Sequence, residues 1–437
     1  MAVAPSASVI ALGCPKNRVD SEYLLASLGL AGFTLDSDPD SADVIVVTTC
    51  GFIRSAVEES KAAVRQALAV KRRRPTTRVI VAGCLVQRYG QALVRRFPGV
   101  DLFVGIDRLP DIPAMLGYEG RIAVSPRPSR LGCSRSPRLL STPPHYAYMT
   151  IADGCDNRCS YCLIPDIRGP LRSRPVPDVL AEARLLVEAG VKELVLVAQD
   201  TTAYGIDRYA GPALPRLLDR LSALPGLKWL RLMYAHPAHL QNGTIARFAR
   251  LPNLCRYIDL PIQHVSDRIL TLMGRGYLRR DLESMLGQLR SIEDMAIRAT
   301  VIVGFPGETE AEFSEMLGFL RHAGFDRLGA YAYSRERGSR AASLPNQVPE
   351  PVKHERLRRL MKMQEGISRR RLRRLLGRRV SVQMDTPTTG RTEWDAPEID
   401  GDVRIVGSSF VPGQMLEVRV TRTGAHDIWA EPDRKDG

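Results

Sequence analysis

Short apolar runs alternate with amphipathic helical stretches along most of this chain, and that alternation restricts the folds open to it. Between residues 6 and 122, helical stretches separate four strand-like runs, SVIALGC, ADVIVVTTC, TRVIVAGC and VDLFVGI. Gly32 is placed to end the helix after the first run, whose apolar face consists of Val19, Leu24, Leu25 and Leu28. Strands that alternate with helices form parallel sheets, so we expect residues 6–122 to be a doubly wound α/β domain.

A second region, residues 141–372, repeats the pattern six times. Its strand-like runs are YAYMTIA, KELVLVAQD, KWLRLMYA, RYIDLPIQ, RATVIVGF and RLGAYAYS. Six such repeats predict a partial parallel (β/α)6 barrel, in which chemistry belongs at the carboxyl ends of the strands. The polar residues at or just after those ends are Cys155, Gln199, Asp200, Tyr234, His236, Gln263, His264 and Tyr333. We expect His236 and His264 to be structural, because a single histidine at a strand end is more often a hydrogen-bonded residue than a catalyst.

The last region, residues 373–437, changes to short alternating runs, RVSVQMD, DVRIVG and QMLEVRVTR, which predict a small all-β barrel. From residue 380 onward it holds eleven acidic against six basic residues, a net charge of −5. Its acidic group WDAPEIDGD contains Asp395, Glu398, Asp400 and Asp402. A barrel that binds RNA should not carry this sign of charge, whereas one that binds a basic protein could. The alternative is a solvated acidic loop.

Composition favours a globular protein that works in the cytosol. The chain has 437 residues, 44% of them hydrophobic, and no apolar run reaches the ~18 residues of a membrane span. The first basic residue is Lys16, so a signal peptide with a charged start is not expected. Six of the eight cysteines stand in ligand-like positions, which favours reduced thiolates for metal over disulfides. Cys133 and Cys255 are expected to be incidental or packing residues.

Three cysteines, Cys155, Cys159 and Cys162, form a C-x3-C-x2-C set that contains no fourth ligand. A structural zinc site needs four protein ligands, whereas a 4Fe-4S cluster on three cysteines leaves one iron open for chemistry. The spacing therefore favours a reactive cluster. The alternative is a zinc knuckle whose fourth ligand is Cys133 or His145.

A second set, Cys14, Cys50 and Cys84, ends three of the four strand-like runs of the first domain. In a doubly wound sheet the carboxyl ends of the strands line one crevice, so these thiolates should converge although they are far apart in sequence. Three converging thiolates again favour an open 4Fe-4S cluster. Three unrelated buried cysteines are the alternative.

The formal net charge of +14 comes largely from one predicted helix, KHERLRRLMKMQEGISRRRLRRLLGRR at residues 353–379. It holds twelve Lys or Arg against Glu355 and Glu365, a net +10. Its predicted apolar face consists of Leu357, Leu360, Met361, Ile367, Leu372, Leu375 and Leu376. The helix is interpreted either as a solvated cover for the barrel or as a contact with ribosomal RNA.

The C-x3-C-x2-C set, with Tyr161 before its last cysteine, resembles the signature of the radical S-adenosylmethionine superfamily. That resemblance implies a cluster that reductively cleaves S-adenosylmethionine to a radical able to abstract hydrogen from carbon. The segment VIVGFPGETE resembles the superfamily's G-x-I-x-G-x-x-E segment near the cofactor. It implies that Gly304 allows close backbone approach to the cofactor and that Glu308 is structural or hydrogen-bonding. The predicted cofactor-binding residues are Tyr161, Gln199, Gln263, Gly304 and Glu308.

The sequence ALGCPKNRVDSE around Cys14 resembles the methylthiotransferases that modify a ribosomal protein, the RimO type. DAPEID resembles that branch's form of the terminal TRAM-type domain, and the resemblance covers nearly the whole chain. It implies two 4Fe-4S clusters and methylthiolation of an aspartate β carbon in the small-subunit protein uS12. It also implies a low-potential electron donor of the flavodoxin or ferredoxin type. One departure is Arg337 before Gly338, where the family usually has a Glu-Gly pair.

Two other functions stay open at this point. The same chemistry on an adenosine of transfer RNA is disfavoured by GCPKN, where the transfer-RNA branch has a GCQMN-like sequence, and by the acidic terminal barrel. A non-catalytic RNA- or ribosome-binding factor stapled by zinc would use the same cysteines for structure.

Overall fold

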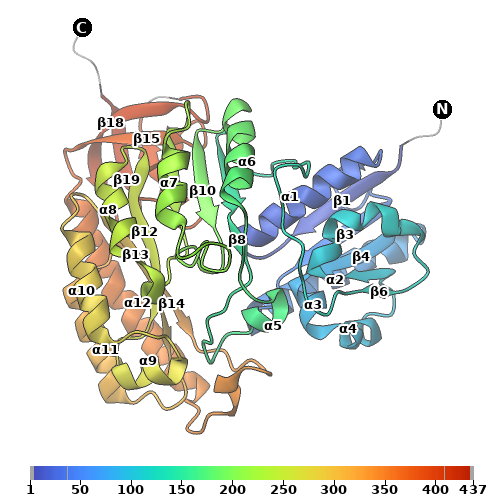
Figure 1. Ribbon diagram of the computed structural model, residues 1–437, viewed down its shortest axis with the longest axis horizontal. Coiled ribbons are helices and arrows are strands. Elements are labelled where there is room, and N and C mark those ends of the chain that lie inside the picture. Colours follow the sequence, from blue (N-terminus) through green and yellow to red (C-terminus); the bar gives the residue numbers. More distant parts are fainter. Residues whose placement is uncertain (1–3, 37, 408, 434–437) are drawn as a thin grey trace.

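The computed structural model describes residues 4–36, 38–407 and 409–433, in three bodies of secondary structure (Figure 1). Two parallel six-stranded sheets are followed by a closed barrel of five strands, which confirms the α/β class and the predicted order of units. Residues 434–437, the end of the predicted domain 373–437, lie outside the described part. Within that part, every helix is too short or too polar to cross a lipid bilayer.

The first sheet is parallel throughout and has the strand order β2-β1-β3-β4-β5-β6. Helix α1 covers one face through Leu24 and Leu28, and α2 to α4 cover the other, so the sheet is doubly wound as predicted. The sequence does not predict the two outer strands, β2 and β6, because a strand of two residues is too short to show a periodic pattern. The elements are β1 (Ser6–Ala11), α1 (Pro15–Leu30), β2 (Thr34–Leu35), β3 (Val44–Thr49), α2 (Arg54–Arg73), β4 (Arg78–Gly83), α3 (Cys84–Tyr89), α4 (Gln91–Arg96), β5 (Leu102–Val104) and β6 (Ile122–Ala123).

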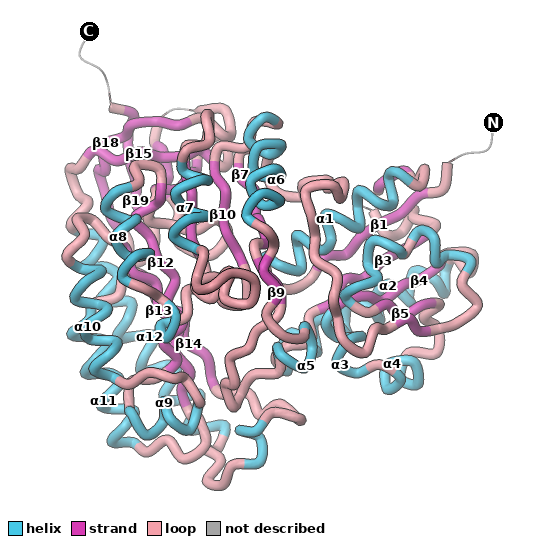
Figure 2. The backbone as a smooth tube through the Cα atoms, viewed as in Figure 1, coloured by secondary structure: helices cyan, strands magenta, loops and turns pink. Residues whose placement is uncertain are grey.

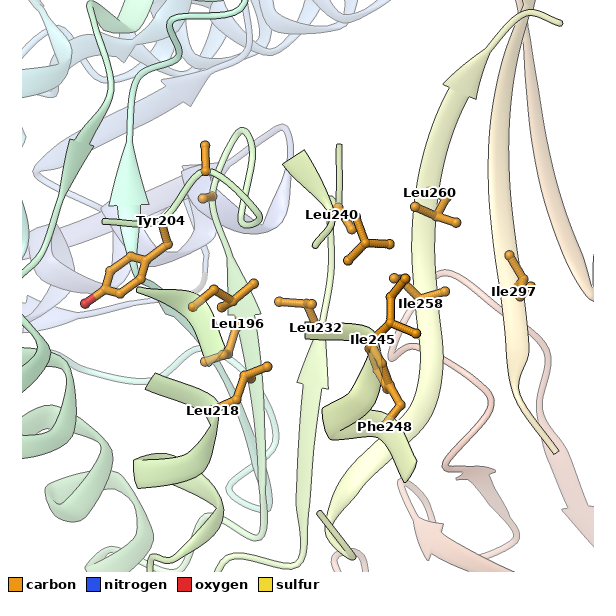
Figure 3. Close-up of a cluster of buried hydrophobic side chains, with 14 of the residues drawn as sticks. Leu196, Tyr204, Leu218, Leu232, Leu240, Ile245, Phe248, Ile258, Leu260 and Ile297 are labelled. Carbon is orange, nitrogen blue, oxygen red and sulfur yellow. The ribbon is translucent and has the colours of Figure 1, made fainter. Parts of the chain in front are cut away.

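The second sheet has the order β14-β13-β12-β11-β10-β7 and is not closed, which confirms the partial (β/α)6 barrel; we call it the half barrel. A large apolar layer joins its strands to the outer helices, as Figure 3 shows around Leu232, Ile258 and Phe248. Its strands are β7 (Tyr146–Thr150), β10 (Glu193–Val197), β11 (Trp229–Leu232), β12 (Leu254–Gln263), β13 (Ala296–Val303) and β14 (Arg327–Ala332). Its helices are α5 (Ile164–Arg168), α6 (Val176–Glu188), α7 (Leu214–Ser222), α8 (Asn242–Arg250), α9 (Asp267–Met273), α10 (Arg279–Arg290), α11 (Glu310–Ala323) and α12 (Glu350–Arg373). Two short strands, β8 (Ala152–Asp153) and β9 (Arg172–Ser173), pair beside it.

Side chains from all three units fill the interior of the half barrel. Val19 and Tyr23 of α1 pack there against strand residues such as Tyr148 and Tyr257. Ala396, in the loop 393–402 of the C-terminal barrel, belongs to the same cluster, and Trp394 packs against it. Cys255 is buried in this cluster, as expected for a packing residue. The first and last units therefore complete the core of the middle one.

The C-terminal barrel is formed by β15 (Arg379–Met384), β16 (Thr389–Thr392), β17 (Val403–Ile405), β18 (Met415–Thr423) and β19 (Ile428–Pro432). It lies at the amino-terminal end of the half-barrel strands, where Arg391 pairs with Glu193 at the start of β10. His145, just before β7, bonds Asp385 of the barrel.

The acidic group of this barrel differs from both interpretations of the sequence. Asp395 pairs with Arg327 of β14, and both side chains are buried. Asp400 accepts a hydrogen bond from the Tyr257 hydroxyl at 2.7 Å and lies 3.5 Å from Arg298. Glu398 and Asp402 remain exposed, and Glu398 pairs with Arg18 of α1. Asp395 and Asp400 thus attach the C-terminal barrel to the half barrel, because the arginines of the half barrel need a carboxylate nearby when they are buried.

Helix α12 begins at Glu350 and ends at Arg373, shorter than the predicted helix 353–379, and Arg379 already belongs to β15. Its buried face includes Leu360, Ile367 and Leu372, but Met361 and Leu376 are exposed, contrary to the expected apolar face. Lys353 and Arg356 are buried instead. Periodicity did not reveal this because long basic side chains can cover apolar surface and pair with buried acids.

Gly304, at the end of β13, lies against the side chain of Lys353 of α12. Its φ is +71°, and a Cβ at this position would lie 2.3 Å from Cγ of Lys353. The Lys353 ammonium then donates to the Tyr333 carbonyl at 3.0 Å. The glycine leaves room for a lysine of α12, and the close approach to the cofactor that the sequence predicts at this position stays a prediction.

The buried pairing at Glu193 gives a prediction for stability. Its carboxylate bonds Arg231 and Arg391 at 2.7 Å each, with all three side chains at most 3% exposed. Glu193→Ala should lower the free energy of unfolding by about 3–5 kcal/mol, because the buried Arg231 loses its counter-charge and Arg391 keeps only Asp385. Guanidinium denaturation followed by fluorescence of the nearby Trp229 and Trp394 measures it.

Glu365→Ala is the matched control. Glu365 pairs with Arg369 on the exposed face of α12 at 2.7 Å, with both side chains about half exposed. Its loss should cost less than about 0.5 kcal/mol. Equal shifts for the two variants would contradict a structural role for the Glu193 cluster.

Candidate functional site

The three cysteines of the first domain converge at one edge of its sheet. Cys14 precedes α1, Cys50 follows β3 and Cys84 begins α3. A Cβ on Gly13 would lie 3.1 Å from Cβ of Cys50, and one on Gly51 would lie 2.8 Å from the Cys84 carbonyl oxygen. The three loops are therefore in direct contact, as the strand-end positions predicted.

Asn17 joins these loops from the first turn of α1. Its Nδ2 donates to the carbonyls of Leu12 and Thr49 at 3.1 and 3.2 Å. Its Oδ1 lies 3.6 Å from Cys84 Sγ and 4.0 Å from Cys14 Sγ. Asn17 is thus a site residue that the strand pattern did not reveal.

The other three cysteines lie in the loop between β8 and α5, at the carboxyl end of β7. The backbone N–H of Ile164 donates to Cys162 Sγ at 3.4 Å, and Arg275 donates to Cys159 Sγ at 3.3 Å. The same guanidinium donates to the Tyr161 hydroxyl at 3.2 Å, which orients the aromatic residue of the motif.

The proposed fourth ligands of a zinc knuckle are engaged elsewhere. His145 lies at the opposite end of β7 and bonds Asp385 at 2.9 Å, and Cys133 contacts the Ser136 hydroxyl at 3.3 Å. In the described part of the chain, only Asp200, His236 and His239 have ligand atoms that all lie within 4.8 Å of one another. Three sulfurs on one tetrahedral zinc would lie about 3.8 Å apart, given a Zn–S bond of about 2.3 Å. In each cysteine set at least one pair of sulfurs therefore lies farther apart than in a zinc site, which fits a cluster whose thiolates bind different irons.

Burial controls the proton occupancy of these sulfurs. It raises the pKa of Cys84 and of Cys162 to about 12 and that of Cys155 to about 11. Arg168 opposes this effect at Cys84, and Arg275 opposes it at Cys162. Because a metal binds the thiolate, cluster loading must release these protons.

Buried polar atoms without a partner gather at the carboxyl ends of adjacent half-barrel strands. Among the described residues they include Oε1 of Gln199 after β10, Nε2 of His236 after β11 and Oε1 of Gln263 at the end of β12. Such groups are normally hydrogen-bonded when buried, so their common position makes these strand ends the candidate ligand site. The amide oxygens can accept from ammonium or hydroxyl groups, and His236 can donate to a carboxylate. These are the polar groups of S-adenosylmethionine, so the residues fit that cofactor.

His236 is a hydrogen-bond donor rather than a metal ligand. Its Nδ1 accepts from the Ala238 N–H at 3.2 Å, which places the ring proton on Nε2. Burial lowers the pKa of His236 to about 3, so the ring is neutral. Neighbouring His239 bonds Asp200 at 2.6 Å, which raises the pKa of His239. With its proton on Nε2, His236 lacks the lone pair that a metal ion would need at that atom.

Two other predicted residues are bound within the protein. The Glu308 carboxylate accepts from the Gly304 N–H at 2.8 Å and pairs with Arg356 of α12 at 2.8 Å. His264 is fully buried, with its Nε2 3.6 Å from Glu308. Glu308 therefore holds the β13 loop to α12, and its predicted cofactor contact stays a prediction.

Arg168, at the end of the helix α5 that follows Cys162, reaches the first cysteine site across the domain boundary. Its Nη2 donates to Asn17 at 2.8 Å, to Asp20 at 2.7 Å and to Cys84 Sγ at 3.4 Å. Figure 2 shows α5 between the half barrel and the first domain, close to α3. The arginine is six residues after Cys162, and no spacing rule distinguished it from other arginines.

The Arg337-Gly338 segment lies at the same boundary. Its carbonyl at Arg337 accepts from Arg88 at 3.2 Å, and the preceding Glu336 pairs with Arg88 at 2.9 Å. Glu336 also accepts from the Arg54 N–H at 2.6 Å. The contact at residue 337 is made by its carbonyl, which any residue supplies, so the departure from the family pattern leaves this contact between the domains in place.

Comparison with known proteins agrees with this geometry. Family profiles match the uncharacterized protein family UPF0004 at residues 6–105, the radical SAM superfamily at 149–320 and the TRAM domain at 376–432. The radical SAM methyltransferase TsrM from Kitasatospora setae has the same fold over 76% of this chain and 75% of its own, with a TM-score of 0.55 at 15% identity.

Full-length relatives are far more similar. The ribosomal protein uS12 methylthiotransferase RimO of Desulforamulus reducens is 42% identical over 98% of this chain and 99% of its own length. The RimO proteins of Anaeromyxobacter sp. strain K and Geobacter sulfurreducens are 43% and 41% identical, over 95% and 97% of this chain and 91% and 98% of theirs. With this identity along its length and a radical SAM profile over its C-x3-C-x2-C loop, the chain belongs to the RimO family of radical SAM methylthiotransferases.

Proposed function

We propose that this enzyme methylthiolates the β carbon of an aspartate in ribosomal protein uS12, using two 4Fe-4S clusters. The observation that carries the proposal is the pair of three-cysteine sites on either side of one domain boundary, across which Arg168 of the half barrel reaches Asn17 and Cys84 of the first domain. Each site offers three sulfurs and therefore leaves a coordination position open. Two open clusters suit a reaction that needs both a carbon radical and a sulfur donor.

When bound, S-adenosylmethionine and the cluster on Cys155, Cys159 and Cys162 would supply hydrogen abstraction, and the cluster on Cys14, Cys50 and Cys84 would hold the methylated sulfur that the carbon radical receives. The chain's own residues position the reactants. Gln199 and Gln263 accept hydrogen bonds from the cofactor, and His236 donates to its carboxylate. The buried barrel wall excludes water from the radical.

The substrate assignment follows the relatives, which carry the uS12 methylthiotransferase name at 41–43% identity. The terminal barrel supports it less than its sequence suggested, because Asp395 and Asp400 are occupied within the protein. Asp402 remains exposed and available to a basic protein, whereas the exposed Glu398 already pairs with Arg18. An enzyme acting on a ribosomal protein would work in the cytoplasm and would need a flavodoxin or ferredoxin as electron donor.

The cysteine assignment predicts the iron content. Protein purified without oxygen should hold about eight irons per chain, four from each cluster, and Cys50→Ala should keep about four and lose methylthiolation. Iron and sulfide analysis measures this, with Cys133→Ala as the control that keeps about eight irons and full turnover. Colourless, zinc-loaded protein would favour the binding-factor alternative, and full turnover of Cys50→Ala would contradict the second cluster.

The substrate is tested in cells with and without the gene. The intact mass of uS12 should lose a methylthio increment when the gene is deleted, while transfer-RNA nucleosides from the same cultures stay unchanged. Loss from the nucleosides instead would move the substrate to transfer RNA and leave the radical chemistry standing.

The exposed basic face of α12 and the turn after it is the proposed contact with ribosomal RNA: Lys362, Arg370, Arg373 and Arg374. Binding to small-subunit particles should weaken steeply with salt, and replacing these four residues with Gln should flatten the slope. Arg279→Gln, in an exposed acidic cluster with Glu283 and Glu315, is the control. A flat salt dependence for the unmodified enzyme would exclude this contact.

A further inference from the structure

Each cysteine site contains one buried arginine that donates a hydrogen bond to a cysteine sulfur. At the first site it is Arg168, 2% exposed, whose Nη2 lies 3.4 Å from Cys84 Sγ. At the second it is Arg275, 4% exposed, whose Nη1 lies 3.3 Å from Cys159 Sγ. Both guanidinium groups come from the half barrel, although Cys84 belongs to the first domain.

The surroundings of Arg275 indicate that its counter-charge is the cysteine site. Its remaining hydrogen bonds, within the described residues, go to neutral groups: the hydroxyls of Tyr161 and Tyr277 and the carbonyl of Pro261. A buried cation is costly without a nearby anion. Deprotonated sulfur at Cys159 is the anion that the geometry offers.

The charges around Arg168 also favour an anion. Arg168, Lys16 and Arg172 surround Asp153, and Arg168 also pairs with Asp20. Three cations thus face two carboxylates, which leaves one positive charge against the sulfurs of Cys84 and its neighbours. Asp153 in turn accepts from Gln199 at 3.0 Å, so this charged group reaches the proposed cofactor site.

We propose that Arg168 and Arg275 each set the reduction potential of one cluster, Arg168 that of the N-terminal cluster and Arg275 that of the radical SAM cluster. Both are positioning residues that act through a cysteine sulfur. The inference rests on the proposed function, because it requires a cluster on Cys14, Cys50 and Cys84. Hydrogen bonds to the sulfurs and nearby positive charge favour the reduced, more negative cluster, so they raise its potential.

The test uses full-length protein in two backgrounds, each keeping one cysteine set. One carries Cys155→Ala, Cys159→Ala and Cys162→Ala, and the other carries Cys14→Ala, Cys50→Ala and Cys84→Ala. Arg168→Met and Arg275→Met are introduced into each, and midpoint potentials come from redox titration followed by electron paramagnetic resonance. Arg168→Met should lower the potential of the N-terminal cluster only, and Arg275→Met that of the radical SAM cluster only.

Lysine variants separate tuning from folding. Arg168→Lys and Arg275→Lys keep the charge and one donor, so each should lower the potential by less than the Met variant. An unchanged potential in an Arg168→Met or Arg275→Met protein that still holds its cluster would overturn the inference for that arginine. If the protein with Cys155→Ala, Cys159→Ala and Cys162→Ala holds no iron while both arginines are intact, the two-cluster function is overturned, and the role of Arg168 with it. Iron analysis of the parent proteins therefore distinguishes the two failures.

Discussion

A six-stranded parallel half barrel cannot bury its inner face by itself, and the architecture of this enzyme follows from that constraint. The outer face is covered by its own helices, as in other α/β folds. The inner face is covered by α1 of the first domain and by the loop 393–402 of the last, which share one apolar cluster with the strands. The three units therefore share one interior and are not independent domains joined only by linkers.

Buried ion pairs at the edges of this interior determine how the three units are aligned with one another. Glu193 with Arg231 and Arg391 fixes the C-terminal barrel, and Arg138 with Glu22 and Glu182 ties the first domain to α6. Such groups are costly to bury unless their partners are placed accurately, so they favour one relative position of the domains. That position matters for chemistry because Cys84 and Arg168 come from different domains.

The sequence predicted the strands of the half barrel, the doubly wound first sheet and the convergence of Cys14, Cys50 and Cys84, because hydrophobic period and strand-end position are local signals. It did not predict contacts between distant segments. Nothing in the local pattern of α12 distinguished the buried Arg356 from the exposed Arg358, since only the position of Glu308 makes burial of that charge possible. The acidic loop misled for the same reason: its charge was visible, but the arginines that neutralise Asp395 and Asp400 lie about 70 to 100 residues earlier. His236 was predicted to be structural, and its buried, unpartnered Nε2 adds it to the proposed cofactor contacts.

The position of α1 inside the half barrel also constrains the order of biogenesis. The first domain leaves the ribosome before any half-barrel strand exists, so its face with Lys16, Val19 and Tyr23 initially has nothing to pack on. During that interval Arg168 does not yet contact Cys84, and the cysteine is open to the surrounding solution. Synthesis therefore provides a period in which the first cysteine site is open to loading with the proposed cluster and to oxidation, and docking of the half barrel ends both.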